Sequence, residues 1–164
     1  MLSAHGAAMT EEPPSPRRPT LVIAVSQEEL RRWATIEVAA SWAGAVHIVY
    51  EISDLFHGDF GNNFVLLICL KNLIKAFRRH PRRWPYFIRR GRVVLMETNA
   101  NMERIVPYIS AVNAVLVAGL HEGKAVEIVR AVKTGMLVLP REILDRLLSC
   151  TAEERGPHAP YRGP

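Results

Sequence analysis

The amino-acid sequence predicts an α/β fold in which helices cover a parallel sheet. Short apolar runs recur along the chain, and stretches with helical periodicity separate them. The connections between successive runs are too long for hairpins, so we expect parallel strands with right-handed crossovers. Five runs make a (βα)5 unit, and 164 residues with 49% hydrophobic content are enough for one domain with a real core.

The first three predicted strands lie in the first half of the chain. Residues 20–25 (TLVIAV) form a continuous β-rich run, which is typical of a strand covered on both faces. Ser26 is predicted to cap the helix that follows, because Glu29 three residues later completes a capping box. That helix is predicted to reach about residue 43. Its apolar face consists of Leu30, Ala34, Val38 and Trp42. The second and third strands are predicted at residues 45–52 and 63–70.

Residues 71–91 are predicted to form two short helices. Pro81 ends the first helix, since proline cannot continue it. Pro85 is tolerated in the first turn of the second helix, where its missing N–H is not needed. The run at residues 92–98 (RVVLMET) is the fourth predicted strand.

The last part of the chain repeats the alternation. Pro107 should shorten or kink the helix that leads to the fifth predicted strand, at residues 112–119. The helix after this strand is expected to stop at Gly135, because glycine is favoured just beyond a helix end. A final helix is predicted over residues 141–149.

Both ends of the chain are predicted to lie outside the folded domain. Residues 1–19 are polar and rich in proline, which predicts a disordered arm rather than a signal peptide. A linker helix at 141–150 is followed by residues 151–164, whose Pro, Gly, Arg and His predict a flexible linker. The folded domain is therefore predicted at residues 20–140. No apolar run approaches the ~18 residues that a membrane span needs.

The two cysteines, Cys69 and Cys150, do not have the spacing of a metal site. Cys69 lies in the apolar third run and is predicted to be a reduced core residue. A reduced cysteine favours a cytoplasmic protein.

A resemblance to a known family appears in residues 93–140. The segment EIVRAVKTGMLVLP (127–140) resembles the last helix and exit of a response-regulator receiver domain, and it follows a fifth run, AVLVAG (114–119). The stretch is most similar to receivers of LuxR-type transcription regulators, which continue with a short helix, here REILDRLL (141–148). The resemblance implies a flavodoxin-like (βα)5 three-layer sandwich, with parallel sheet order 2-1-3-4-5 and an extra C-terminal helix.

In those regulators a polar linker leads from the last helix to a DNA-binding helix-turn-helix. The resemblance therefore implies that residues 151–164 lead toward a DNA-binding domain that this chain lacks. Two explanations stay open: a chain cut at the linker, or a receiver that acts alone. Either way, the resemblance implies that DNA is contacted only through the missing helix-turn-helix.

The resemblance also places the phosphorylation chemistry of receivers on residues that cannot perform it. The family's metal-binding carboxylates match Val25 and Ser26, and its phosphoacceptor Asp matches Ile68. Its Lys matches Ala118, and its Thr/Ser position matches Thr98, or Met96 if the register slips. Magnesium needs oxygen ligands, and phosphoryl transfer needs the carboxylate. We therefore predict no metal, no cofactor, no enzymatic activity and no Mg²⁺-dependent phosphorylation.

Three acids lie near these positions. Glu28 and Glu29 are predicted to be solvent-facing caps, because the N-terminus of a helix favours anions. Glu97 ends the fourth predicted strand, so it is either an ordinary end-of-strand residue or a carboxylate that faces the same pocket.

A receiver without its nucleophile is expected to act through contacts. The resemblance implies a homodimer that forms through the fourth-to-fifth region, as a platform for a helix-turn-helix. The predicted function is a non-phosphorylatable regulatory domain of a bacterial transcription regulator. The candidate dimer face consists of Ile105, Tyr108, Ile109, Val115, Val126 and Arg130.

An alternative from another functional class also stays open. The chain can be a stand-alone adaptor or sensor that binds a small ligand or a partner protein in the vacated acidic pocket, where open α/β sheets bind ligands. An enzyme is disfavoured, because the sequence has no phosphate loop, no dinucleotide fingerprint and no acid–base pair.

The positive charge of the chain is concentrated in one segment. Residues 71–92 contain nine Lys or Arg and no Asp or Glu, which leaves 12 cations against 16 anions elsewhere. We interpret the segment as a solvated loop with a short helix anchored by Trp84 and Phe87. Contact with an acidic protein partner, or with DNA beside a helix-turn-helix, and autonomous nucleic-acid binding are the alternatives. The candidate basic patch consists of Arg78, Arg79, Arg82, Arg83, Arg89 and Arg90.

Overall fold

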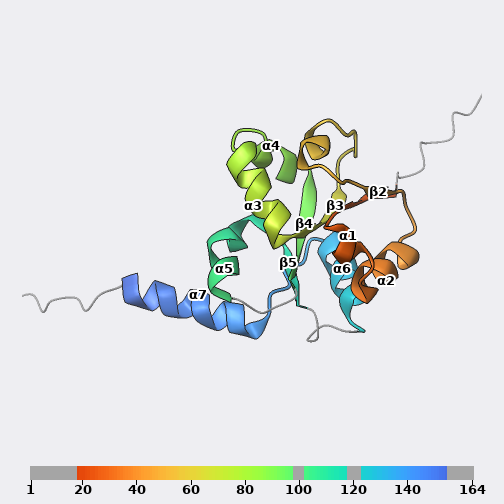
Figure 1. The fold of residues 1–164 in the computed structure, drawn as a ribbon. Helices are drawn as coiled ribbons and strands as arrows, with labels where there is room; N and C mark the ends of the chain where they lie inside the picture. Colours follow the sequence, from red (N-terminus) through yellow and green to blue (C-terminus); the bar gives the residue numbers. More distant parts are fainter. Residues whose placement is uncertain (1–17, 98–101, 118–122, 155–164) are drawn as a thin grey trace, which may run out of the picture.

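The computed structural model describes residues 18–97, 102–117 and 123–154, and it contains one five-stranded parallel sheet (Figure 1). The strand order is β2-β1-β3-β4-β5, which confirms the predicted order. All five strands lie within the predicted apolar runs or within one residue of them. Their bounds are β1 Leu21–Ala24, β2 Val46–Ile48, β3 Phe64–Cys69, β4 Gly91–Glu97 and β5 Ala114–Val117.

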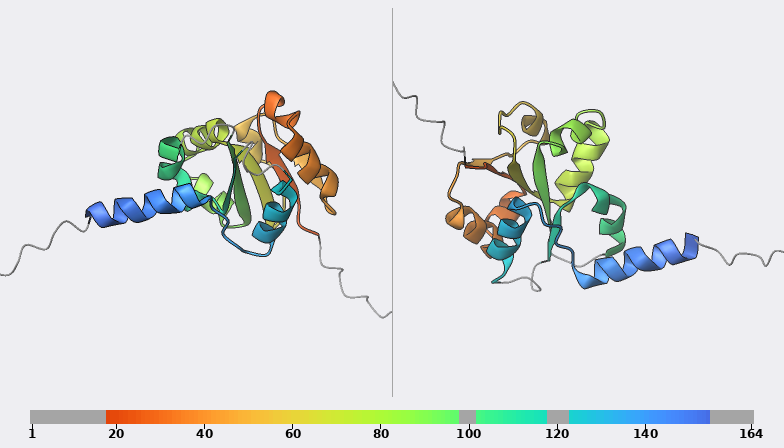
Figure 2. Two further views of the ribbon diagram at one scale, coloured as in Figure 1. Left: turned by 90° about the horizontal axis from the view of Figure 1, so that it is seen from below. Right: turned by 180° about the vertical axis from the view of Figure 1, so that it is seen from behind.

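Helices cover both faces of this sheet, which gives three layers (Figure 2). One face is covered by α1 (Gln27–Leu30), α2 (Trp33–Ser41) and α6 (Ala125–Lys133), and α2 packs against α6. The elements on the other face are α3 (Leu70–Arg79), α4 (Trp84–Ile88), α5 (Met102–Ile105) and the 3₁₀ helices η1 (Ile52–Phe56) and η2 (Val106–Ala111).

The central strand β3 shows why a continuous apolar run folds as it does. Alternate side chains of a strand point to opposite faces. Phe64, Leu66 and Ile68 join the core beneath α3, while Val65, Leu67 and Cys69 join the core beneath α2 and α6. Because both faces are covered, all six side chains are buried. Each large aliphatic side chain buried in this way contributes about 1.5–3 kcal/mol.

The helix predicted from residue 27 to about 43 is broken in two. The backbone of Arg32 is extended, so α1 ends at Leu30 and α2 begins at Trp33. The predicted apolar face nevertheless packs on the sheet: Val38 is buried, and Leu30 and Trp42 are partly buried against the same core. The periodicity therefore identified the packed face, but not the break.

The segment after β2 contains a short 3₁₀ helix, η1, where the sequence analysis gave no helix. Leu55 of η1 is fully buried, but η1 leaves the edge strand β2 exposed along its whole length.

The helix after β4 is shortened as predicted at Pro107: the α-helix ends at Ile105 and continues as 3₁₀ turns. A proline in this position removes a backbone donor that an α-helix would use.

The structure describes residues on both sides of the predicted folded domain at 20–140. Arg18 and Pro19, predicted in the N-terminal arm, are tied to the end of α2, because Trp42 Nε1 donates a 2.8 Å hydrogen bond to the Pro19 carbonyl. At the other end, α7 (Arg141–Glu154) runs past the predicted limit at residue 149. Ile143 is buried in the core and Leu147 packs against it, while the C-terminal part of α7 extends away from the domain (Figure 2). No helix in the described ranges is long and apolar enough to cross a membrane.

Candidate functional site at the carboxyl edge of the sheet

The carboxyl ends of β1 and β3 meet at one edge of the sheet, where open α/β folds place their ligands. Val25 follows β1 and is buried in the core beneath α2 and α6. Ser26 is exposed and caps α1. Its Oγ accepts a 3.3 Å hydrogen bond from the Glu29 backbone N–H, and the Glu29 carboxylate accepts a 3.2 Å bond from the Ser26 N–H. The predicted capping box is confirmed.

The two acids of α1 take part in local structure. Glu29 completes the capping box, and Glu28 lies 3.7 Å from Arg32 in an exposed i,i+4 pair. Such an exposed pair contributes little to stability, about 0.3–0.5 kcal/mol. Both carboxylates lie in the first turn, where the helix dipole stabilises negative charge. Glu29 therefore has the predicted capping role, whereas Glu28 makes an exposed ion pair and is not part of the capping box.

Ile68 and Cys69 end β3, and their side chains point to opposite faces. Ile68 is paired in register with Ala24 and is fully buried beneath α3. Cys69 is the last strand residue and is buried on the side of α1 and α2. Neither side chain offers a carboxylate oxygen at the end of this strand.

The Cys69 thiol is a poor nucleophile and a poor metal ligand here. Burial raises the pKa of this thiol from 9.0 to about 11, and the nearby Glu29 carboxylate adds to the shift. Hydrogen bonds to the backbone of Asn72 and Ser26 act in the opposite direction but are outweighed. At neutral pH the thiol is therefore protonated, and only the thiolate attacks electrophiles or binds metals.

Asn72 is a residue of this edge that the sequence analysis missed. Its Nδ2 donates a 2.9 Å hydrogen bond to the carbonyl of Ala24, so it joins the first turn of α3 to the end of β1. The only signal in the sequence is an asparagine inside a helix, where asparagine is disfavoured without a specific hydrogen bond.

The remaining predicted site residues lie at the ends of β4 and β5. Glu97 is the last residue of β4, half-buried and in register with Val117. Strand alternation places its side chain on the Leu95 face of the sheet, which is the α3 face. Thr98 and Ala118 lie outside the described residues. Within the described ranges, no three His, Cys, Asp or Glu side chains come together as metal ligands.

The structure corrects two members of the candidate dimer face. The side chains of Ile105 and Val115 are fully buried, because Ile105 turns into the core from α5 and β5 is covered on both faces. They are not surface contacts. Tyr108, Ile109 and Val126 are partly buried at the rim of the two cores, and Arg130 is exposed on α6.

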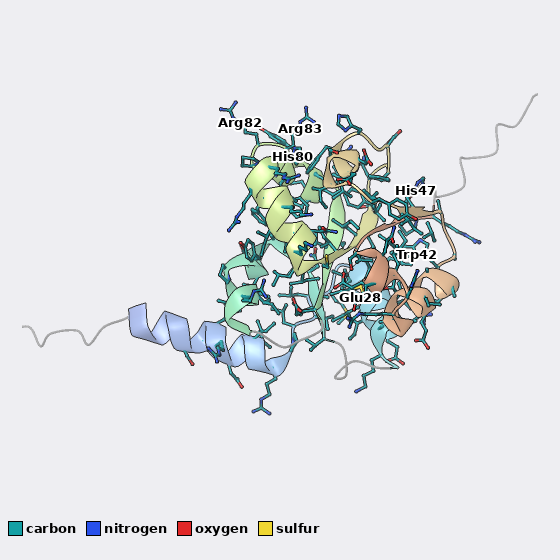
Figure 3. All side chains as sticks on the ribbon, in the orientation of Figure 1. Glu28, Trp42, His47, His80, Arg82 and Arg83 are labelled. Carbon is teal, nitrogen blue, oxygen red and sulfur yellow. The ribbon has the colours of Figure 1, made fainter. Side chains whose placement is uncertain are left out.

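The basic patch lies at the opposite end of the sheet from the carboxyl edge. It surrounds α4, which directly precedes β4, and all six of its arginines are exposed. Figure 3 shows Arg82 and Arg83 projecting outward, far from Glu28 of α1. Trp84 and Phe87 are buried beneath them, so the predicted anchoring of this short helix is confirmed.

Comparison with known proteins shows a likeness of fold. No family model matches the sequence, and no curated protein matches it. The regulatory domain of the master biofilm regulator CsgD is similar in structure, with a TM-score of 0.56 at 13% identity, over 79% of this chain and 98% of that domain.

Two further solved structures are more distant. The bacteriophytochrome response regulator AtBRR gives a TM-score of 0.45 at 17% identity, over 71% of this chain and 94% of that chain. A signal receiver domain of an HD domain-containing protein from Pseudomonas fluorescens Pf-5 gives 0.44 at 11% identity, over 76% and 98%. At these identities the likeness concerns the fold, which is the flavodoxin-like fold of receiver domains.

Proposed function

We propose that this chain is a receiver-like regulatory domain of a transcription regulator that acts without phosphoryl transfer. One observation carries the proposal. At the carboxyl ends of β1 and β3, a phosphorylatable receiver needs carboxylates, and this chain has the buried side chains of Val25, Ile68 and Cys69. The fold it shares with the regulatory domain of a biofilm regulator supports the regulatory part of the proposal.

The local chemistry supports the absence of a replacement nucleophile. Glu29 is held in the capping box, and Glu28 faces Arg32. The Cys69 thiol stays protonated at neutral pH, because burial raises its pKa. A buried apolar edge also disfavours a hydrated Mg²⁺, which needs oxygen ligands and keeps several waters.

Phosphorylation is tested directly with small phosphodonors. The chain is incubated with acetyl phosphate and Mg²⁺ and analysed by intact-mass spectrometry, and in parallel its melting temperature is measured with and without beryllofluoride. A receiver that retains its Asp is the positive control. We expect no phosphoryl mass and no beryllofluoride shift. A Mg²⁺-dependent adduct on any carboxylate overturns the proposal.

Signalling by contact requires a surface, and we propose that this surface forms a homodimer. The side of the molecule at the β5 edge carries Tyr108 and Ile109 of η2, and α7, which passes beside α5 in Figures 1 and 2. Val126 and Arg130 of α6 instead line a groove between α2 and α6. On α7, Leu144 and Leu148 are 43% and 68% exposed and lie one turn apart. Exposed leucines on a projecting helix are typical of a helix that packs against a partner.

Light scattering of the purified chain tests the dimer. We expect a dimer for the natural sequence and a monomer for Leu144→Ser/Leu148→Ser. Ile36→Ser/Tyr50→Ser is the matched control, because these side chains are 54% and 64% exposed on another part of the surface. A strict monomer at tens of micromolar, or equal dissociation by the control pair, contradicts the dimer.

A further inference from the structure

A surface pocket of about 630 Å³ lies between η1 and α4. It is formed where η1 meets the turn before α4 and the end of α4, at the amino ends of the strands. Its lining residues are Phe56, Arg82, Arg83, Tyr86, Phe87 and Arg90. We propose that this pocket binds a nucleotide, with the phosphate on the arginines and the base against the aromatic side chains. This inference does not depend on the proposed regulatory function.

The aromatic side of the pocket is built into the core. Phe87 is buried, and its ring lies 5.6 Å from that of Phe56, which in turn contacts the ring of His80 at 4.6 Å. These contacts hold Phe56 and Phe87 in place. Tyr86 is different, because it is 71% exposed at the pocket rim. The Arg89 guanidinium lies over one face of the Tyr86 ring, 5.8 Å from its centroid. The fixed aromatic wall and the other face of this tyrosine offer a stacking surface for a nucleobase.

The cationic side is free to bind an anion. The ion pairs Glu28–Arg32 and Arg141–Asp145 lie elsewhere in the described part of the chain, and neither involves an arginine of the pocket. The segment from residue 71 to 92 also contains no Asp or Glu that would neutralise them. Guanidinium groups bind phosphate through planar, bidentate hydrogen bonds, so Arg82, Arg83 and Arg90 suit a phosphate group.

The size and composition of the pocket narrow the class of ligand. Small-molecule pockets usually have about 300–1,000 Å³, and this one falls in that range. An inorganic anion would use the arginines alone and leave the aromatic wall unfilled. A nucleotide uses both, because it joins a phosphate to a flat base.

The bound nucleotide can be a free nucleotide or one unit of a single-stranded nucleic acid. Arg78, Arg79 and Arg89 are exposed and continue the charge outside the pocket, where further phosphates of a strand would lie. A duplex keeps its bases stacked and cannot present one to the aromatic wall. The experiment therefore uses both single-stranded and free probes.

Binding is measured by fluorescence anisotropy with a short fluorescein-labelled oligothymidylate, in competition with ATP and with tripolyphosphate, which has no base. Arg82→Ser/Arg83→Ser removes two phosphate contacts, and Tyr86→Ala removes the exposed ring. Arg31→Ser/Arg104→Ser is the matched control, because both residues are exposed and lie outside the pocket. These substitutions remove the same charge as the double substitution in the pocket. Circular dichroism and thermal melting verify that each variant is folded.

We expect saturable binding of the oligonucleotide, of ATP or of both. The probe that binds with the higher affinity shows whether the pocket takes a single-stranded nucleic acid or a free nucleotide. Tyr86→Ala should weaken binding by about five- to a hundredfold, as expected for one stacked base. The double arginine variant should weaken it at least as much, and the control should change it little. The proposal is overturned by no binding, by equal competition from tripolyphosphate and ATP, by unchanged affinity in Tyr86→Ala, or by an equal loss in the control.

Discussion

The side-chain amide of Asn72 donates a 2.9 Å hydrogen bond to the backbone carbonyl of Ala24, 48 residues earlier in the chain. This bond joins the first turn of α3 to the carboxyl end of β1, at the edge of the sheet where receivers carry out their chemistry. A phosphorylatable receiver needs polar side chains here to hold a metal ion. In this chain the polar contact at the same edge holds two elements of the fold together.

Asn72→Ala should lower the free energy of unfolding by about 1–2 kcal/mol, because the Ala24 carbonyl loses a partner in a half-buried place. Urea unfolding followed by circular dichroism measures the change. Asn62→Ala is the control, since Asn62 is an exposed asparagine before β3. If the two variants lose the same stability, the bond to Ala24 contributes nothing in solution.

Because of Cys69, we predict that the free energy of unfolding falls at alkaline pH. Burial raises the pKa of the native thiol to about 11 from its usual 9.0, so between these values the unfolded chain has lost this proton while the native chain keeps it. Stability from this group is therefore complete below pH 9 and falls as the pH rises toward 11. The natural chain should lose more stability over that range than Cys69→Ala, in which the titrating thiol is gone.

Denaturant unfolding at several pH values between 8 and 11 measures this difference. Lysines and tyrosines titrate in both proteins, so the comparison isolates Cys69. On a Cys150→Ser background, which leaves Cys69 as the one thiol of the chain, native protein should react with a thiol reagent far more slowly than unfolded protein. Parallel pH curves for the two proteins, or rapid native labelling, contradict a buried and protonated thiol.

The sequence was informative where both faces of an element are covered. The run from Phe64 to Cys69 predicted β3 because its residues are apolar on both sides, and the structure buries all six. The Ser26–Glu29 capping box was equally readable, since it depends on residues three apart. Both features depend on residues that are close in the sequence, so the sequence alone predicts them.

The features that the sequence did not predict depend on distant contacts. The break at Arg32 falls inside a regular apolar period and at a residue that favours helices, so only packing reveals it. Ile105 and Val115 looked like surface contacts, because apolar residues at an expected interface and apolar residues in a core have the same pattern. Phe56 reaches the arginine pocket from η1, a 3₁₀ helix that the sequence analysis did not identify.

Ile68 provides a test of the position that the resemblance matches to the phosphoacceptor of receivers. Its side chain is fully buried beneath α3, so Ile68→Asp places a carboxylate in the core and should destabilise the domain by at least about 3 kcal/mol or prevent folding. Ile68→Val, the conservative control, should lose about 0.5–1.5 kcal/mol. The measurement is urea unfolding. A stable Ile68→Asp variant would mean that this side chain reaches solvent, and that the edge is more open than the structure has it.

Gly91 and Phe64 form a tight pair at the amino ends of β4 and β3. The two residues are in register, and a Cβ added to Gly91 would meet the Phe64 ring at 2.4 Å, which is far below van der Waals contact. The ring is buried and also contacts Phe87 at 4.7 Å, so it has little room to move. Gly91→Ala should therefore lower the free energy of unfolding by about 1–3 kcal/mol, the usual effect of overpacking.

A double-mutant cycle separates this clash from a general effect of alanine. Phe64→Leu alone should destabilise the domain, because it removes part of a buried ring. In the Phe64→Leu background, Gly91→Ala should be much less harmful, since the smaller side chain leaves space for the new methyl group. The expected coupling is about 0.5–3 kcal/mol. Additive losses would show that Gly91 is needed for its backbone rather than for its contact with Phe64, and that β3 and β4 approach each other less closely in solution.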